Sequence, residues 1–333
     1  MSNKKFIVKK EAAGRRLDKY LADKFLKISR SQLKKMIQRG LVLVNEHMVC
    51  PHYFIKEGEI IHVTCNMKHI TEPAQQALAK KENPNLKPQI IFEDENFLVI
   101  DKPAGLLVHA TEKNEPETLV SWLIAKYPEI KKVGEQKYRG GIIHRLDRDV
   151  SGIMLVVKNN DAYNFLKLQF KNRVIKKEYI ALVYGRIEKA QGKIELPIGR
   201  SVNGRYVAHP QKGGTKFLDS DKTAKTLFWA TDYLKDYTLL RIKILTGRTH
   251  QIRVHLSAIG HPILGDKLYK PKKKFLKLFS KRIKVVDPGR ILLHSKKIGF
   301  YNLDKKWVEY KSPLPQEFQD FIDKKFYKSL LNC

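Results

Sequence analysis

Cysteine is scarce in this sequence. The 333 residues include only three cysteines, and no two of them have CxxC spacing; they are Cys50, Cys65 and Cys333. This scarcity argues against a disulfide framework and against a thiolate zinc site. The interpretation that remains is three ordinary thiols in a reducing compartment.

Long apolar runs are also missing. No window contains about 18 consecutive apolar residues, so we expect no membrane span. The opening stretch MSNKKFIVKKEAAGRR has no apolar core of the kind that a signal peptide needs. We therefore expect a cytoplasmic protein without a membrane partner.

Acidic residues are few relative to basic ones. The chain has 34 Asp and Glu against 65 Lys and Arg, which gives a net charge of +31. Such an excess favours a polyanionic partner, either a nucleic acid or an acidic membrane. A lysine-rich genome would explain many of the lysines, but it would not explain arginines that stand inside motifs.

Nucleotide and metal signatures are absent. There is no GxxxxGK segment followed by Ser or Thr, and GEQKYRGGI lacks the glycine spacing of a dinucleotide site. No histidine belongs to an HExxH pair, so we expect no metal and no cofactor. We interpret the histidines as nucleic-acid contacts or as groups with satisfied hydrogen bonds; they are His109, His144, His250, His255, His261 and His294.

A small α/β unit is predicted at residues 14–65. Apolar residues recur at helical spacing from Leu17 to Phe25, and SQLKKMIQRG is typical of a second helix that ends at Gly40. LVLVN and EIIHVTC are predicted strands. Six basic residues lie on or beside the two predicted helices: Arg15, Arg16, Arg30, Lys34, Lys35 and Arg39.

The rest of the chain divides into a linker and a larger domain. Residues 66–90 are polar, contain prolines and show no sustained period, which is typical of a linker. In residues 91–333, strand-like segments outnumber helical ones and hairpin-like returns are common. We therefore predict an α+β fold whose mixed sheet is largely antiparallel.

The segment HRLDRDVSG, residues 144–152, places charged residues directly before the apolar run IMLVV. Asp147 stands between Arg145 and Arg148, and a nearby cation favours an ionised carboxylate. That suits a nucleophile or a base and does not suit a general acid. A structural Arg–Asp pair that fixes a loop is the alternative, and spacing alone favours it.

Three other segments place polar residues at the ends of predicted strands, where rigid scaffolds carry functional sites. TGRTHQIRVHL contains Arg248, His250 and Arg253, KKEYIALVYG places Tyr179 at the start of a strand, and DKPAGLLVHA follows another. These repetitions weaken the purely structural interpretation of Asp147.

Together these motifs resemble the RluA-type RNA pseudouridine synthases, in particular the large-subunit RluC- and RluD-like members. HRLDRDVSG matches the catalytic motif of that family, with Val150 where the family usually has Thr, and GHPILGD also matches in order. The resemblance covers residues 91 to about 312. RLDKYLADKFLKISRSQLKKMIQRGLVLVN resembles the RNA-binding module first known from a small-subunit ribosomal protein.

The resemblance implies that a uridine in RNA is cut at its glycosidic bond, turned over and rejoined through carbon-5, without a cofactor. Asp147 would be the essential carboxylate, which either attacks the sugar or abstracts a ribose proton. Arg253 would pair with Asp147, and Tyr179 would stack on the target base. Arg145 would enter the gap left by the flipped uridine, and Leu240 would form an apolar floor or belong to the core.

Large-subunit ribosomal RNA is the substrate that the resemblance favours, and transfer RNA is the alternative. We expect a monomer with further RNA contacts from His144, Arg248, His250, Arg30, Lys34, Lys35 and Arg39. The basic segment 267–284 is interpreted as an RNA-backbone contact, with a solvated face as the alternative. A non-catalytic RNA-binding or ribosome-assembly factor on the same scaffold remains open.

Overall fold

The chain forms two compact units, Met1–Glu82 and Asn83–Cys333. The computed structural model describes residues 2–25, 28, 30–51, 53–65, 86–110, 115, 117–135, 139–201, 205–208, 221–234, 236–271 and 286–330. Most of the expected linker at 66–90, and most of the basic segment at 267–284, lie outside the described residues. Each unit is described by itself below.

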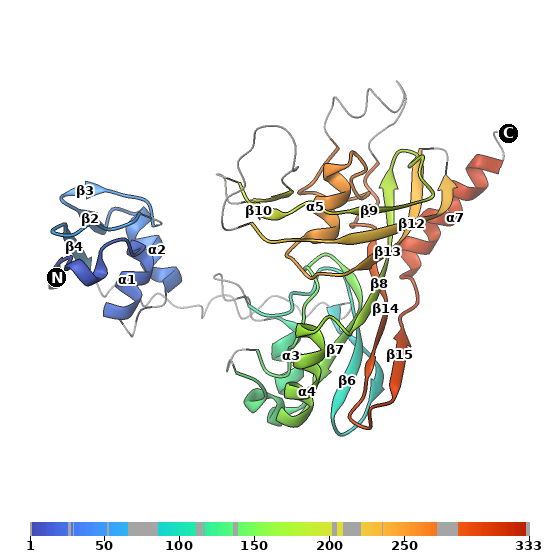
Figure 1. Ribbon diagram of the computed structural model, residues 1–333, viewed down its shortest axis with the longest axis horizontal. Helices are drawn as coiled ribbons and strands as arrows, with labels where there is room; N and C mark the ends of the chain where they lie inside the picture. Colours follow the sequence, from blue (N-terminus) through green and yellow to red (C-terminus); the bar gives the residue numbers. More distant parts are fainter. Residues whose placement is uncertain are drawn as a thin grey trace. The chain divides into compact units, whose positions relative to one another are not determined.

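The first unit is a four-stranded antiparallel sheet with two helices (Figure 1). The strand order is β1-β4-β2-β3, and helices α1 and α2 pack on one apolar core with Leu17, Leu33 and Ile61 at its centre. The elements are β1 (Ser2–Ile7), α1 (Leu17–Lys24), α2 (Arg30–Gln38), β2 (Val42–Val44), β3 (His47–Met48) and β4 (Ile60–Cys65).

Two details of the first unit differ from the expectation at 14–65. Strand β1 lies before residue 14 and pairs along its whole length with β4, so the sheet includes the amino-terminal residues. Arg16 forms an ion pair of 2.9 Å with the buried Asp18, and Arg15 pairs with Asp23. These two arginines therefore already have carboxylate partners within the unit.

The second unit is built on one nine-stranded sheet with the order β5-β6-β7-β14-β8-β13-β12-β9, and β15 pairs with β14. All but one of its pairings are antiparallel. Its strands are β5 (Gln89–Glu93), β6 (Phe97–Lys102), β7 (Ser151–Val157), β8 (Lys176–Tyr184), β9 (Gln191–Ile194), β12 (Thr226–Leu234), β13 (Tyr237–Ile244), β14 (Leu293–Tyr301) and β15 (Trp307–Lys311). A separate hairpin pairs β10 (Ile198–Arg200) with β11 (Tyr206–Ala208).

In the described part of the second unit, four α-helices pack beside the sheet. Figure 1 shows α3 and α4 beside β6 and β7, and α5 beside β10 and β12. The helices are α3 (Leu119–Lys126), α4 (Asn160–Lys171), α5 (Gln251–Ala258) and α7 (Gln316–Leu330). Thr118 caps α3, and Asn159 caps α4. None of the described helices has the length and apolarity needed to cross a membrane.

The predicted α+β fold with a largely antiparallel sheet is confirmed. Alternate side chains of β8 pack into two different hydrophobic cores. Tyr179, Ala181 and Val183 belong to the core under α3 and α5, while Leu182 and Tyr184 pack with Phe318 of α7. The beginning of β8 thus points Tyr179 toward the same side as the end of the Asp147 loop.

The single parallel pairing brings the Asp147 loop to the centre of the sheet. β7 and β14 pair at Ser151 with His294 and at Gly152 with Ser295. Gly152 has a φ of +116°, and a Cβ at this position would lie 2.3 Å from the Ser295 carbonyl oxygen. Only glycine lets the two strands approach this closely.

We expect the substitution Gly152→Ala to destabilise the second unit by about 2–4 kcal/mol, because it adds a backbone clash to an unfavourable φ. The control is Gly289→Ala, which has a φ of +81° but open space around the added Cβ. The control should lose only about 1–2 kcal/mol. Urea unfolding measures both, and equal losses would show that the close approach of β14 costs nothing.

Candidate active site

The Asp147 loop is held from below by Lys102, at the end of β6. The Lys102 side chain is completely buried, and its ammonium donates hydrogen bonds to the carbonyls of Pro103 (2.8 Å), Leu106 (2.9 Å) and Arg148 (3.0 Å). Burial lowers the pKa of Lys102 to about 7. The loop is therefore tied to the preceding strand one residue after Asp147.

Asp147 is paired with Arg253 of α5. Arg253 Nη1 donates a hydrogen bond of 3.0 Å to Asp147 Oδ2, and the Asp147 side chain keeps 19% of its surface exposed. Among the described residues, nothing donates a hydrogen bond to Asp147 Oδ1. One carboxylate oxygen is thus held by the protein, and the other is available to a bound molecule.

Arg253 is itself fixed by a second carboxylate, that of Asp266. The guanidinium donates from Nε to Oδ2 (2.7 Å) and from Nη2 to Oδ1 (2.9 Å), and Asp266 Oδ1 also accepts from the backbone of Leu268 and Tyr269. Such a bidentate pair sets the plane of the guanidinium as well as its position. The direction from Arg253 Nη1 to Asp147 therefore depends on Asp266.

The electrostatics of this cluster follow from burial. Burial alone would lower the pKa of Arg253 and raise that of Asp266. The mutual hydrogen bonds and charges reverse both effects, so the pKa of Arg253 is raised and that of Asp266 is lowered. Both groups are charged at neutral pH, and removal of either would leave a buried unpaired charge.

His250 stands at the first turn of α5 in a left-handed conformation, with a φ of +57°. Its Nε2 lies 3.8 Å from Asp147 Oδ2, and its Nδ1 lies 3.0 Å from the Tyr269 hydroxyl. Burial lowers the pKa of His250, although the charge of Asp147 opposes that shift. The neutral ring borders the carboxylate.

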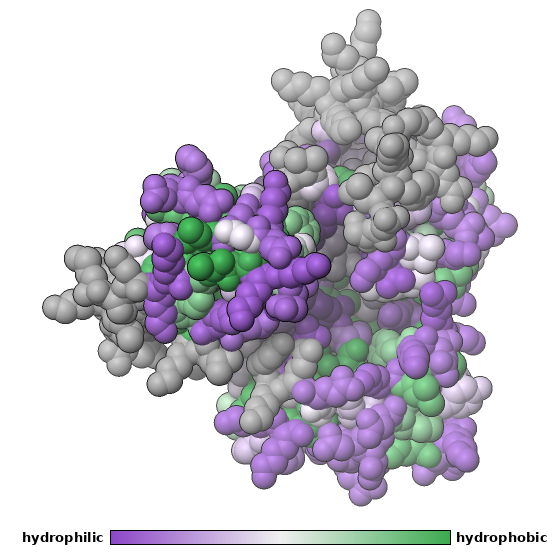
Figure 2. Space-filling view, turned by 60° about the vertical axis from the view of Figure 1, so that its left-hand side comes forward, coloured by the Kyte–Doolittle hydropathy of each residue, from purple (hydrophilic) through white to green (hydrophobic). Residues whose placement is uncertain are grey.

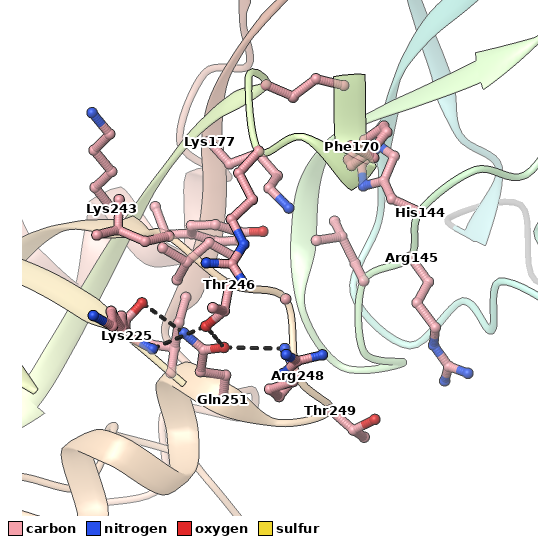
Figure 3. A pocket seen from close by; sticks show the side chains of 18 of the residues that line it. His144, Arg145, Phe170, Lys177, Lys225, Lys243, Thr246, Arg248, Thr249 and Gln251 are labelled. Atoms are coloured by element: carbon pink, nitrogen blue, oxygen red, sulfur yellow. Dashed lines mark hydrogen bonds between the residues drawn. The ribbon is translucent and has the colours of Figure 1, made fainter. Parts of the chain in front are cut away.

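The turn before α5 is braced by Gln251. Its side-chain oxygen accepts from the Thr246 hydroxyl (2.7 Å) and from the Arg248 backbone (3.1 Å), while its amide donates to the Lys225 carbonyl. Figure 3 shows these bonds on one side of the cavity, with His144 beside Phe170 on the other. The motif TGRTHQIR therefore forms a rigid turn that places Arg253 in the first turn of α5.

Tyr179 lies on β8, and its side chain is buried. Burial raises the pKa of its hydroxyl, and the charge of Asp147 raises it further. The hydroxyl therefore stays protonated at neutral pH. It can donate a hydrogen bond beside Asp147.

Asp147, Tyr179, His250 and Arg253 line one cavity of about 870 Å³. Nine basic residues line it, and Asp147 is the only carboxylate among its described lining residues. The basic residues are Arg145, Lys171, Arg173, Lys176, Lys177, Lys225, Lys243, Arg248 and Arg253. A cavity of this size with such a charge suits an anionic ligand larger than a single ring.

The other expected site residues are distributed unevenly. Arg145 is exposed at the cavity rim and hydrogen-bonds His109, and Arg248 bonds the Thr223 carbonyl. His144 Nε2 accepts from the Leu155 backbone (2.8 Å), and its ring stacks on Phe170, so this ring nitrogen serves the fold. Burial lowers the pKa of His144 to about 3.

Leu240 does not line the cavity. It lies on β13 opposite Ala181 and Ala230 and is fully buried. Of its two expected roles, Leu240 therefore has the one in the core and does not form the apolar floor. Leu293 and Val150 supply apolar surface there instead. Val150 is 3% exposed among apolar neighbours, which explains why a valine fits this position without a hydroxyl.

The remaining expected RNA contacts belong to the first unit. Arg30, Lys34 and Lys35 lie on α2, and Arg39 follows that helix as an exposed residue. Among the described residues no group of three or more His, Cys, Asp or Glu is arranged to hold a metal ion.

Sequence reasoning missed the roles of Asp266 and Tyr269. GHPILGD had been recognised as a motif, yet nothing in its spacing from Arg253 indicates a bidentate pair. Gly265 lets the chain place Asp266 beside Arg253. Its φ is +76°, and it passes so close to Arg290 that a Cβ would lie 1.9 Å from the Arg290 carbonyl oxygen. The signal in the sequence is Gly265 directly before Asp266, an aspartate that the structure shows to be buried.

Comparisons with known proteins agree with this geometry. Residues 96–258 match the RNA pseudouridylate synthase family, and residues 15–61 match the S4 domain. An RNA pseudouridine synthase of Aquifex aeolicus is 36% identical over 315 residues, which cover 93% of this chain and 94% of the relative. The ribosomal large subunit pseudouridine synthase D of Pseudomonas aeruginosa is 33% identical over 92% of this chain and 91% of its own length.

A solved human structure, RNA pseudouridylate synthase domain containing 1, superimposes with a TM-score of 0.53 at 26% identity, and covers 71% of this chain and 87% of its own. The matched family region contains both Asp147 and Arg253. Since the relatives match nearly the full length of both chains, this chain belongs to the RNA pseudouridine synthase family and carries an S4 domain at its amino-terminal end.

Proposed function

We propose that this RNA pseudouridine synthase uses Asp147 as its catalytic carboxylate and modifies uridine in large-subunit ribosomal RNA. The observation that supports Asp147 most directly is its isolation. It is the one described carboxylate in a cavity lined by nine basic residues, and Arg253 holds only one of its oxygens. A protein that only binds RNA has no use for a carboxylate there, because it repels phosphate.

The chemistry assigned to Asp147 follows from its free oxygen. Asp147 Oδ1 would either attack the anomeric carbon of the target nucleotide or take a proton from its ribose. In both cases the glycosidic bond from N1 breaks and the uracil turns over. Carbon-5 then forms the new bond to the ribose, Asp147 returns to its free carboxylate, and the proton on carbon-5 is lost while N1 gains one. Arg253 keeps the carboxylate in one orientation during these steps. Such positioning contributes to the rate.

Tyr179 has a different role in this proposal. Its ring supplies a flat apolar surface for the uracil, and its hydroxyl is a donor because burial raises its pKa. The exposed Arg145 at the rim would occupy the stack that the uridine leaves, since its guanidinium is planar. Neither role needs a metal or a cofactor.

The choice of ribosomal RNA rests on two observations. Several relatives, from Pseudomonas aeruginosa and Haemophilus influenzae among others, are named as ribosomal large subunit pseudouridine synthase D. The chain is also strongly basic, and Figure 2 shows hydrophilic residues over much of the described surface that faces the viewer. A large RNA binds a basic surface through many phosphates.

We expect Asp147→Asn to abolish pseudouridine formation by at least about 10³-fold, while the affinity for RNA changes little. The amide keeps the shape of the side chain and removes the nucleophile and base. The matched control is Asp149→Asn in the same loop, because Asp149 is exposed and does not line the cavity. Single-turnover assays would contradict the assignment if both variants kept full activity.

The Arg253–Asp266 pair should make stability depend on pH. The pKa of folded Asp266 lies below its unfolded value of about 3.9, so the pair contributes fully above that value. Its contribution is lost as the pH falls through the folded pKa. Arg253→Met should therefore cost about 3–5 kcal/mol at pH 7.5 and clearly less at pH 4, where Asp266 is protonated in the variant.

Urea unfolding of wild type and variant at the two pH values tests this expectation. Arg248→Met is the control, because Arg248 belongs to the same motif and bonds only a carbonyl in the described residues. It should cost about 1 kcal/mol at both pH values. A cost for Arg253→Met that does not change with pH would show that Asp266 is not its energetic partner.

The RNA target is tested by mapping pseudouridine in total RNA from cells with and without the gene. We expect specific sites in large-subunit ribosomal RNA to disappear. Loss of pseudouridine in transfer RNA alone would show that the substrate is transfer RNA, and the proposed chemistry would stand. Asp147→Asn expressed in the deleted strain separates a loss of catalysis from a loss of the protein.

A further inference from the structure

Lys177 lines the cavity without a carboxylate partner in the part of the chain that the structure describes, and it has no part in the chemistry assigned to Asp147. Lys177 lies two residues before Tyr179 on β8, so both side chains point to the same face of the sheet. Figure 3 shows its side chain reaching into the cavity between Phe170 and Thr246. Its ammonium lies 3.8 Å from the position that a Cβ on Gly247 would take, beside the rigid turn before α5.

The nearest described neighbours of this ammonium carry no negative charge. It stands 5.2 Å from the centre of the Phe170 ring, whose neighbour His144 is neutral. Among the described residues no group accepts a hydrogen bond from Lys177 Nζ, and no carboxylate forms an ion pair with it. By contrast, Lys225 at the same cavity pairs with Glu195 at 2.7 Å.

Desolvation makes this arrangement costly. Burial alone lowers the pKa of Lys177 to about 8, without any compensating partner. A lysine kept in such a place gains most from a ligand that is itself negative, because the ligand restores the lost solvation of the ammonium. An aromatic ring alone restores only a part of it.

Lys177 and Asp147 lie at different parts of the cavity wall. Lys177 Nζ lies beside the Phe170 ring and Gly247, whereas Asp147 is held by Arg253 and borders His250. A nucleotide that meets Asp147 therefore leaves Lys177 for a neighbouring group of the strand. In a polynucleotide, the negative group that lies beside the target base and ribose is a backbone phosphate.

We propose that Lys177 forms a phosphate subsite, which holds a phosphodiester of the RNA backbone next to the target uridine through a hydrogen bond from its ammonium. Gly247 keeps the approach to this ammonium open, since it adds no side chain. This subsite rests on the proposed function of the cavity. It adds a residue that positions the strand, and it leaves the chemistry to Asp147.

The experiment compares wild type, Lys177→Met and Lys177→Arg in the full chain, with a transcript of large-subunit ribosomal RNA in a series of KCl concentrations. The half-saturating enzyme concentration and the maximal single-turnover rate are measured separately. Lys177→Met should raise the half-saturating concentration about tenfold and leave the maximal rate within about twofold. The logarithm of the half-saturating concentration is plotted against the logarithm of the KCl concentration. The slope for Lys177→Met should be smaller than that of wild type by about 0.7 to 0.9, which corresponds to the loss of one phosphate contact.

The control is Lys306→Met, an exposed lysine of the same unit that does not line the cavity. It should leave the half-saturating concentration and the salt slope unchanged. Lys177→Arg, which keeps the charge, should restore most of the affinity and the wild-type slope. That restoration separates phosphate binding from packing on Phe170, which methionine and arginine both preserve in part.

Three results would overturn the subsite: an unchanged salt slope in Lys177→Met, a fall in the maximal rate with unchanged affinity, or a folded Lys177→Arg that fails to restore the slope. If wild type makes no pseudouridine in this transcript, the proposed substrate fails. The subsite is then tested on the same RNA by the salt dependence of equilibrium binding, with the same three variants. Failure of the substrate and failure of the subsite thus give different results.

Discussion

The Arg253 guanidinium joins two carboxylates that the chain supplies from different segments, and the active site depends on this junction. Asp266 takes two of its nitrogens in a bidentate pair, and Asp147 takes the third. The first pair is buried and oriented by backbone donors, whereas the second borders the cavity. The orientation of Asp147 in the cavity is thus set by a buried pair behind it, which is how rigid supports position a side chain.

The backbone around this junction is unusually close-packed. Gly152 lets β7 meet β14, Gly265 lets the Asp266 segment pass Arg290, and Lys102 gathers three carbonyls under the loop. Each arrangement removes freedom from one of the groups around Asp147. The frame around Asp147 is therefore tightly packed, whereas the cavity itself is open and lined by basic residues.

The sequence predicted what local patterns encode. The helices of the first unit, the strands that carry apolar runs and the position of Gly40 agree with the structure. Strands β9 and β12 were not predicted, because Thr, Asp and Gly interrupt their apolar pattern. Only pairing makes them strands, of β12 with β13 and of β9 with β12. Leu240 shows the other limit, since periodicity predicts that a side chain is buried but not whether it faces a core or a cavity.

The pairing of Asp147 with Arg253 could be expected only through the family resemblance, because the two residues are separated by a long stretch of sequence. Asp266 and Lys177 went unassigned for a related reason. Their importance comes from what surrounds each charge. Asp266 has a guanidinium beside it, and Lys177 has no counter-charge among the described residues. Such properties belong to the folded chain, and residue spacing does not carry them.

The place of β14 in the sheet has a consequence for how the protein is made. This strand lies between β7 and β8, although the ribosome synthesises it long after both of them. Until residues 293–301 have emerged, two largely apolar strands present unpaired edges, and the Asp147 loop lacks the neighbour that fixes its position. The candidate site of the second unit can therefore be completed only near the end of synthesis, when one of the last strands of the chain becomes available.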